Sequence, residues 1–268
     1  MTFYEAVIFH IQAIIMQMED KLAAIILAAG LGTRMKSDRA KVLHEINGKP
    51  MVMYVLETAK KIAGNDIVLV VGKQAEKVKK LVSDVYEVLF ALQENQLGTG
   101  HAVKCALPMI PEDAEQVLIL CGDVPLLSSG TVAKLYDNHI RKKWDVSILA
   151  AEIENPQGYG RIIMDDKQSV SGIVEEADAT ADQKRIKTIN SGIYCVKKAF
   201  LEYSLNKIKA DNAQGEFYLT DIVKIGYKEN KRVGAIIGED SEEILGVNSM
   251  QDLMVVEGII QKRSGIIS

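Results

Sequence analysis

The chain is poor in the residues that mark secreted or nucleic-acid-binding proteins. It has three cysteines among 268 residues, Cys105, Cys121 and Cys195, and no two of them are spaced as a CxxC pair. An odd number without paired spacing argues against a disulfide framework and indicates reduced thiols in a cytoplasmic protein. The formal net charge is −4, so there is no basic excess for non-specific binding to nucleic acid.

Long hydrophobic runs are also lacking. Residues 1–20 are apolar, but polar residues interrupt them, and they lack the basic start and small-residue cleavage site of a signal peptide. We interpret residues 1–20 as an N-terminal extension that need not be native, because Met18 offers an alternative start. An amphipathic helix that binds a membrane or a partner is the alternative interpretation. Residues 21–268 are then the folded domain.

Short apolar runs alternate with helical patterns along the rest of the chain, which is typical of a parallel sheet covered by helices. Hydrophobic residues make up 48% of the sequence, enough to fill the core of such a domain. We expect an α/β fold: a mixed but mostly parallel sheet flanked by helices, with an inserted β-rich lobe. The predicted strands are Ala23–Leu27, Ile67–Val71, Tyr86–Leu92, Val117–Leu120, Val146–Ala151, Ile193–Val196 and Val233–Ile237, with a hairpin of Ile162–Met164 and Val170–Glu175. The predicted helices begin at Pro50, Gln74, Thr99, Ser129, Ala199 and Met250.

The most informative segment is LAAGLGTRM, which runs from Leu27 to Met35 after the first predicted strand. Small residues let the backbone approach a ligand, and consecutive N–H groups at a strand end form an anion-binding concavity. Arg34 and Lys41 add two cations that suit a polyphosphate. The spacing matches neither a P-loop nor a dinucleotide fingerprint. We infer a nucleoside triphosphate site, the alternative being an ordinary glycine-containing turn.

Polar groups also follow other predicted strands, at the sheet edge where ligands of open α/β sheets bind. In QENQLGTGH, Gln93, Gly98 and Thr99 lie in a turn that can read a base edge; a plain glycine turn capped by Thr99 is the alternative. Asp123 and Asn248 follow two further strands and can hold Mg²⁺, which completes its shell with substrate phosphates and water. A turn cap for Asp123 and a helix N-cap for Asn248 are the alternatives, and Asn248 could serve both roles.

The second half of the chain carries candidates for a sugar site. Glu175 could accept hydrogen bonds from sugar hydroxyls, and Gly160 and Asn190 could donate them. Tyr218 and Thr220, in the polar segment NAQGEFYLTD, could line the same pocket. Each position also has a structural explanation, since Thr220 could instead stabilise the first turn of a helix.

Nine motifs occur in order between Ala23 and Asn248: LAAGLGTRM, KVLHEINGKP, QLGTGHAV, GDVPLL, GYGRI, GIVEEADAT, INSGIY, NAQGEFYLTDI and GVN. Together they resemble the uridylyltransferase (pyrophosphorylase) domain of bacterial bifunctional N-acetylglucosamine-1-phosphate uridylyltransferases, of the nucleotidyltransferase superfamily. The resemblance implies a Rossmann-like fold. It also implies Mg²⁺-dependent synthesis of UDP-N-acetylglucosamine, a cell-wall precursor, and pyrophosphate from UTP and N-acetylglucosamine 1-phosphate. It makes the inserted lobe the sugar-binding part.

With the resemblance, the candidate residues divide by role. The expected catalytic residues are Arg34, Lys41 and Asp123, and the expected metal ligands are Asp123 and Asn248. The expected nucleotide-binding residues are Leu27, Ala28, Ala29, Gly30, Gly32, Lys41, Gln93, Gly98 and Thr99. The expected substrate-binding residues are Cys121, Gly122, Gly160, Glu175, Asn190, Tyr218 and Thr220.

The sequence departs from the family pattern in three ways. Ala40 stands where a proline usually precedes the lysine, and Cys121 stands where tyrosine is common. No hexapeptide repeats of the family's acetyltransferase domain occur, so acetyl transfer is not inferred. The alternatives are a nucleotidyltransferase of the same fold for another sugar phosphate or nucleotide, and a non-catalytic module that binds a sugar nucleotide. No nucleic-acid or membrane partner is expected, and the oligomeric state is left open.

Overall fold

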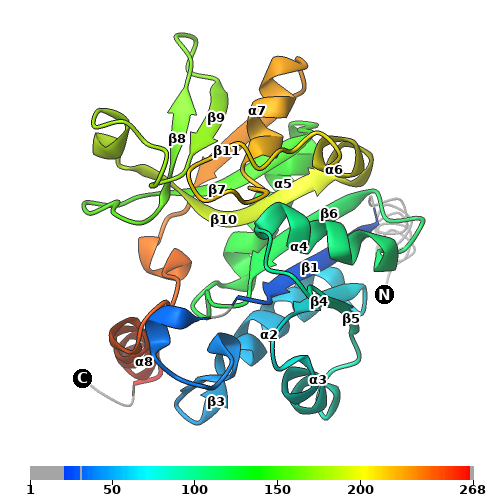
Figure 1. Ribbon diagram of the computed structural model, residues 1–268, viewed down its shortest axis with the longest axis vertical. Helices are drawn as coiled ribbons and strands as arrows, with labels where there is room; N and C mark the ends of the chain where they lie inside the picture. Colours follow the sequence, from blue (N-terminus) through cyan, green and yellow to red (C-terminus); the bar gives the residue numbers. More distant parts are fainter. Residues whose placement is uncertain (1–20, 31, 266–268) are drawn as a thin grey trace, which may run out of the picture.

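A nine-stranded mixed sheet organises the computed structural model, which describes residues 21–30 and 32–265 (Figure 1). The first predicted strand lies inside this sheet and has a parallel neighbour on either side. The predicted extension, residues 1–20, lies outside the described residues and stays a prediction. The strand order is β11 (Val233–Ile237), β7 (Val146–Glu152), β10 (Thr188–Lys197), β6 (Gln116–Cys121), β1 (Leu22–Ala28), β4 (Ile67–Val71) and β5 (Leu89–Leu92).

Among the seven strands in this order, one runs against the others. β10 is antiparallel to both β6 and β7, whereas β1, β4, β5 and β6 are parallel, as are β7 and β11. The central strands are buried on both faces and therefore read as continuous apolar runs. The carboxyl ends of β1, β4 and β6 lie at one edge of the sheet, where the predicted ligand-binding segments begin.

Helices cover both faces of the sheet, as the alternating pattern predicts. Ala23 and Ile25 of β1 face one hydrophobic cluster, and Ala24 and Ile26 face the other. None of the described helices is long and apolar enough to cross a bilayer. The first cluster includes α4 (Thr99–Ala106), α6 (Lys198–Leu205) and α7 (Asp221–Lys228). The second includes α2 (Met51–Ala63), α3 (Ala75–Ser83) and α5 (Ser129–Arg141). A third, smaller cluster anchors α8 (Met250–Arg263).

The predicted β-rich lobe is the hairpin of β8 (Gly160–Met164) and β9 (Val170–Val174), which projects from the upper part of the molecule in Figure 1. It is continuous with the main sheet, because Gly160 and Arg161 of β8 pair with Asn190 and Ile189 of β10. This pairing brings Gly160 and Asn190, two of the predicted sugar-site residues, side by side.

The strand predicted from Ile193 begins five residues earlier, at Thr188, as β10, and two further predicted boundaries are wrong. Pro50 belongs to a short hairpin of β2 (Glu45–Ile46) and β3 (Lys49–Pro50), and its extended ψ of 138° delays the start of α2 to Met51. The strand predicted from Tyr86 begins at Leu89 as β5, because Tyr86 is still bound through its N–H to Val82 O in the turn that ends α3. Both errors lie at element ends, where local turns compete with the regular pattern.

Candidate active site

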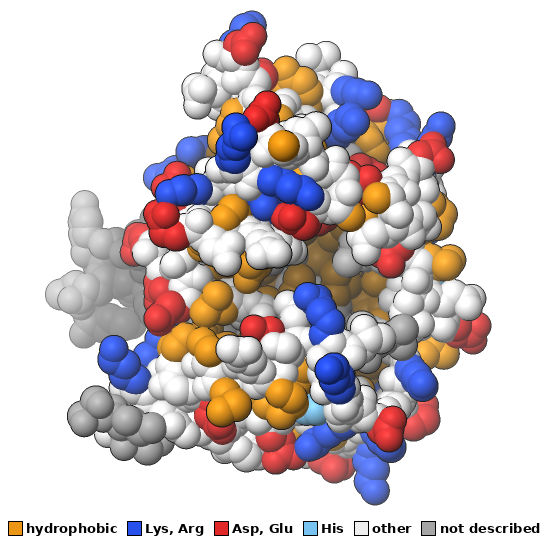
Figure 2. All heavy atoms as spheres, turned by 60° about the vertical axis from the view of Figure 1, so that its left-hand side comes forward, with side chains coloured by type: hydrophobic (Ala, Val, Ile, Leu, Met, Phe, Trp, Pro, Cys, Tyr) orange, Lys and Arg blue, Asp and Glu red, His pale blue; other side chains and the backbone are white. Residues whose placement is uncertain are grey.

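A cavity of about 390 Å³ opens where β1 and β6 end. Figure 2 shows a hollow between the upper and lower parts of the molecule, with Lys and Arg side chains at its edge. Gly122 N donates to Leu27 O at 2.9 Å and so holds the ends of β6 and β1 together. The lining includes the predicted residues Leu27, Ala28, Ala29, Gly30, Gly32, Lys41, Gln93, Gly98, Thr99, Cys121 and Asp123, and also Thr33, Val42, Gln96, Ala102 and Glu216, which the sequence analysis did not single out.

Gly32 brings the loop that follows β1, for which phosphate binding is predicted and which is called the phosphate loop, against Lys41. Its φ is +62°, and a Cβ atom at this position would lie 2.7 Å from Lys41 Cβ. Only glycine adopts this conformation readily while leaving the lysine stem room beside it. The glycine therefore sets the course of the loop and the position of the Lys41 side chain at the same time.

Four predicted residues meet in one polar cluster beside this loop. Lys41 Nζ contacts Asp123 Oδ2 in an ion pair and donates to Asn248 Oδ1 at 2.7 Å. Arg34 Nη2 donates to the same Asn248 oxygen at 2.9 Å. The Lys41 side chain is 11% exposed and that of Asp123 25% exposed, so the pair is partly shielded from water. Residues from three distant segments thus converge on one point.

The backbone holds the two oxygen-bearing residues together. Val247 N donates to Asp123 O at 2.9 Å, so the segment before Asn248 is fastened to the end of β6. The N-cap of α8 is Ser249, which forms a reciprocal capping box with Asp252. The alternative that Asn248 is the N-cap is therefore wrong, and its side chain takes part in the polar cluster instead.

The side-chain oxygens of this cluster are suitable ligands for Mg²⁺. One ammonium group binds both Asp123 Oδ2 and Asn248 Oδ1, so a single cation reaches the two oxygens at once. Carboxylate and amide oxygens are hard ligands that suit Mg²⁺, which typically takes few protein ligands and completes its shell with phosphates and water. No group of three or more His, Cys, Asp or Glu that could hold a metal occurs in residues 21–30 and 32–265.

Gln93, which also lines the cavity, begins a turn that several hydrogen bonds hold in place. Gln93 N donates to Val71 O at 2.8 Å, and Gln93 Nε2 donates to Gly98 O at 3.0 Å. The Thr99 hydroxyl does not cap α4; it accepts a hydrogen bond from Leu219 N at 3.1 Å. This contact ties the start of α4 to the chain segment that contains Tyr218 and Thr220.

The predicted sugar-site residues gather around Glu175. Thr220 Oγ1 donates to Glu175 Oε1 at 3.1 Å, so Thr220 does not cap α7 with its side chain. A Cβ atom on Gly160 would lie 3.2 Å from Glu175 Oε2, which places this carboxyl group against the β8 backbone. Burial raises the pKa of Glu175, and the Thr220 hydrogen bond opposes that shift.

Tyr218 lies on a separate cavity of about 330 Å³, which Glu175 also lines. Its hydroxyl donates to Gln214 Oε1 at 2.7 Å, and its side chain is buried. The cavity that holds Lys41 and Asp123 is lined by neither Tyr218 nor Glu175 among the described residues. The structure therefore divides the predicted residues between the 390 Å³ cavity at the ends of β1 and β6, named the phosphate cavity after its predicted ligand, and a neighbouring group around Glu175.

Cys121, at the end of β6, faces Gly192 of β10. Its thiol donates to Gly192 O with Sγ and O 3.4 Å apart, and a Cβ on Gly192 would lie 2.8 Å from the sulfur. Burial raises the pKa of Cys121 to about 12, so it remains a neutral thiol. The residue packs and positions the strand end rather than acting as a nucleophile.

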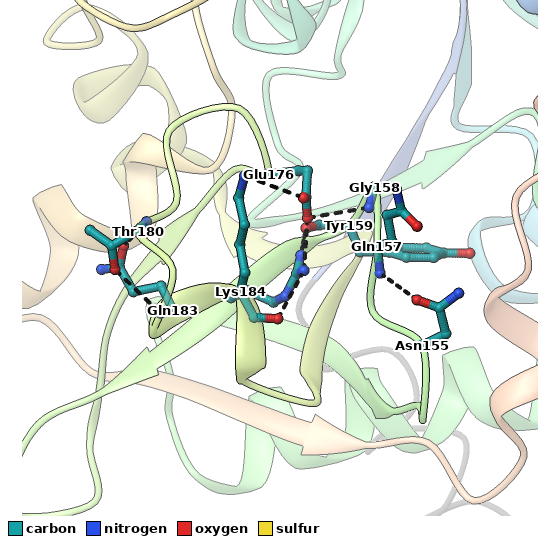
Figure 3. Close-up of polar contacts among 9 residues, drawn as sticks. Asn155, Gln157, Gly158, Tyr159, Glu176, Thr180, Gln183 and Lys184 are labelled. Carbon is teal, nitrogen blue, oxygen red and sulfur yellow. Dashed lines mark hydrogen bonds and ion pairs between the residues drawn. The ribbon is translucent and has the colours of Figure 1, made fainter.

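An ion pair between a buried arginine and a half-buried glutamate had no signal in the sequence analysis. Arg161, 1% exposed, donates through Nη2 to Glu176 Oε2 at 2.7 Å and through Nη1 to Tyr159 O. Glu176 also accepts from Gly158 N at 3.3 Å, and Figure 3 shows its carboxylate between Lys184 and Gly158. Arg161 directly follows Gly160 in the sequence, and Glu176 directly follows Glu175. The ion pair therefore holds together the backbone segments that carry the two predicted residues Gly160 and Glu175.

Comparison with known proteins identifies the family. The nucleotidyl transferase family model matches residues 23–249. The bifunctional protein GlmU of Caldanaerobacter subterraneus subsp. tengcongensis is 48% identical over 244 residues, which cover 91% of this chain and 52% of that protein. GlmU of Geotalea uraniireducens is 45% identical, with 91% and 53% covered, and GlmU of Desulfotalea psychrophila is 41% identical, with 92% and 73% covered. The chain spans about half the length of the first two relatives.

The fold has a solved counterpart. A crystal structure of a Bacillus anthracis protein assigned as a glucose-1-phosphate thymidylyltransferase, in complex with a sucrose, superposes with a TM-score of 0.68. The two sequences are 16% identical, and the match covers 89% of this chain and 94% of that one. This likeness confirms the predicted fold class. The family match and the identities to GlmU show that this chain belongs to the nucleotidyl transferase family, in which it resembles the uridylyltransferase domain of the bifunctional GlmU proteins.

Proposed function

We propose that this chain is a Mg²⁺-dependent uridylyltransferase that makes UDP-N-acetylglucosamine and pyrophosphate from UTP and N-acetylglucosamine 1-phosphate. The observation that carries the proposal is the convergence of Arg34, Lys41, Asp123 and Asn248 beside the phosphate loop. The 41–48% identity to GlmU proteins supports the choice of substrates. The predicted cytoplasmic location stays part of this proposal.

The proposed reaction is an in-line displacement at phosphorus. A phosphate oxygen of the sugar 1-phosphate attacks the α-phosphorus of UTP, the bond to the bridging oxygen breaks, and pyrophosphate leaves. A phosphate monoester is largely ionised near neutral pH, so the attacking group needs no general base. Catalysis then depends on positioning and on neutralising negative charge.

The chain's own residues supply both the positioning of the substrates and the neutralisation of their charge. The backbone of Ala28, Ala29 and Gly30 would bind the triphosphate, and Arg34 and Lys41 would neutralise charge on it. Asp123 and Asn248 would hold Mg²⁺, which supplies further charge neutralisation on the phosphates when it is bound. In this proposal the Lys41 ammonium leaves Asp123 and Asn248 when the nucleotide binds. The lysine then contacts the phosphates.

The sugar-side residues define the acceptor in this proposal. Glu175 and Asn190 would bind sugar hydroxyl or amide groups, and Gly160, which has no Cβ, lets the Glu175 carboxyl lie against the β8 backbone. Tyr218 and Thr220 would shape this side of the site, Thr220 by holding Glu175 through its hydrogen bond.

One experiment separates the proposal from its two alternatives, a nucleotidyltransferase for other substrates and a non-catalytic module that binds a sugar nucleotide. Pyrophosphate release is measured from purified protein with Mg²⁺, UTP and N-acetylglucosamine 1-phosphate, with glucose 1-phosphate and dTTP as parallel substitutions. Release with the first pair alone supports the proposal. Release with a substituted partner alone keeps the nucleotidyl transfer and rejects the substrate, whereas folded protein that is inactive across the panel supports a non-catalytic binding module.

A further inference from the structure

The side-chain amide of Gln93 is held by two acceptors. Its Nε2 donates to Gly98 O at 3.0 Å and lies 3.1 Å from Nδ1 of His101 on α4. An amide NH₂ group has two hydrogens, so both are used by these contacts. The Gln93 side chain is buried, and its backbone is fastened to the end of β4. The amide is therefore fixed in one of its two orientations.

This orientation leaves the carbonyl oxygen of Gln93 for a ligand. No group in the described residues 21–30 and 32–265 donates to Gln93 Oε1, and this oxygen is not among their buried atoms without a partner. Gln93 lines the phosphate cavity, where the strand end faces a bound nucleotide in the proposed function. At Gln93 the protein therefore presents a hydrogen-bond acceptor to the cavity, and the amide donor points away from it.

His101 is suited to accept because of its own surroundings. A neutral imidazole that accepts at Nδ1 carries its proton on Nε2, and Nε2 lies 3.8 Å from Cys105 Sγ, one turn further along α4. Burial raises the pKa of Cys105, so the sulfur stays a neutral thiol that can accept this N–H. His101 and Cys105 line a separate cavity of about 540 Å³, so His101 acts from behind Gln93 and does not line the phosphate cavity.

We propose that His101 is the positioning residue that sets base specificity, because it holds the Gln93 amide with its carbonyl oxygen toward the base. An acceptor at this place pairs with a pyrimidine that carries a hydrogen on N3, as uracil and thymine do. Cytosine has a lone pair on N3 and would face the Gln93 oxygen acceptor to acceptor. The inference rests on the proposed function and makes His101 the residue that excludes cytidine nucleotides.

Removal of His101 weakens the preference for this orientation of the amide. Gly98 O alone then holds the Gln93 NH₂ group, so the rotated amide, which presents its donor to cytosine N3, is disfavoured by one hydrogen bond fewer. The loss of one well-placed hydrogen bond corresponds to about a tenfold change in discrimination. A purely structural role for His101 would lower activity with both nucleotides alike and leave their ratio unchanged.

The test compares kcat/KM for UTP and CTP in four proteins: wild type, His101→Ala, His101→Asn and Lys104→Ala. Asparagine keeps an acceptor oxygen near the place of Nδ1, and Lys104 is an exposed neighbour on the same helix. We expect His101→Ala to lower the UTP/CTP ratio about tenfold, with the KM for the sugar phosphate unchanged. His101→Asn should recover the wild-type ratio in large part, and Lys104→Ala should keep it.

The outcomes separate this inference from the proposed function. A UTP/CTP ratio in His101→Ala that stays within about twofold of wild type overturns the role of His101. Wild-type protein that transfers thymidylate instead rejects the proposed nucleotide, and the same comparison of dTTP with dCTP then tests His101. If the wild type is inactive, UTP and CTP binding measured by calorimetry replaces the rates.

A second measurement needs no variant. The ¹⁵N chemical shifts of the wild-type His101 ring distinguish the two neutral tautomers and the charged ring. We expect the proton on Nε2 and an unprotonated Nδ1. A ring with its proton on Nδ1 cannot accept from Gln93 and would overturn the proposal.

Discussion

Lys41 Nζ and Asn248 Oδ1 lie 2.7 Å apart, although 207 positions separate the two residues in the chain. The same ammonium pairs with Asp123, so the lysine closes a gap between the end of β6 and the segment that leads into α8. This relationship defines the centre of the candidate active site.

Replacing Lys41 with methionine should lower the rate of pyrophosphate release by about two orders of magnitude, because the proposed neutralisation of the triphosphate is lost. The fold should persist, since methionine keeps most of the stem that packs beside Gly32. The measurement is turnover together with thermal unfolding. The matched control is Lys134→Met on α5. This change removes an exposed ion pair with Glu239 and should leave turnover unchanged. Near-normal turnover in Lys41→Met would reject the role given to this lysine.

Gly32→Ala should lower turnover more than its effect on stability explains. Both Gly32 and Gly48 have positive φ, +62° and +76°, so alanine strains either backbone by roughly 1 kcal/mol. Only at Gly32 would the added methyl group meet Lys41, because nothing lies within 4 Å of a Cβ on Gly48. Denaturant unfolding should show a larger loss in Gly32→Ala, which adds the clash with Lys41 to the backbone strain, and turnover should fall in Gly32→Ala alone. Equal turnover in both would show that the close approach to Lys41 does not matter.

Glu175→Gln should stabilise the protein at neutral pH and reduce sugar-phosphate turnover. Because burial raises the pKa of Glu175 above its usual 4.5, the folded state keeps this proton to a higher pH than the unfolded state. Stability contributed at this position is therefore highest at low pH and falls as pH rises from about 4.5 through the folded pKa. Glutamine does not ionise and can still accept from Thr220, so it avoids this fall.

Thermal unfolding between about pH 4 and pH 8 tests this expectation. The melting temperature of Glu175→Gln should exceed that of wild type at the upper end and converge with it at the lower end. Glu87→Gln, at an exposed position, should follow wild type throughout. A constant difference across the range would show that burial of the charge at Glu175 is not its cause.

Glu176→Gln should destabilise the protein by about 3 kcal/mol, because it leaves the Arg161 guanidinium buried without its counter-charge. The matched control is Lys184→Met, which removes a partner of the same carboxylate at 3.7 Å on an exposed side chain, and should change stability by less than about 1 kcal/mol. Chemical denaturation measures both. Similar losses would mean that burial of Arg161 does not govern the strength of this pair.

Much of the fold was readable from hydrophobic patterning. The apolar run Ile67–Val71 is β4 as predicted, and the region from Ile162 to Glu175 forms the predicted hairpin. The pattern did not predict that β10 runs antiparallel between β6 and β7, because a buried strand has the same apolar run in either direction.

The residues of the candidate site likewise fall into those that the sequence predicted and those that it did not. The small residues after β1 and the polar residues at later strand ends were predicted as a nucleotide and metal site, since glycine spacing and strand ends are local features of the chain. Arg161 and Glu176 were missed, because nothing in a strand sequence marks an arginine that is fully buried.

The sequence by itself determined the elements, the glycine-rich loop and the kinds of polar group that the strand ends carry, because propensity and periodicity act over a few neighbouring residues. Only the tertiary structure decided that Lys41 reaches both Asp123 and Asn248, and that Gln93 turns its carbonyl oxygen away from His101. Those contacts depend on strand order and on the packing of separate elements, so no local pattern contains them.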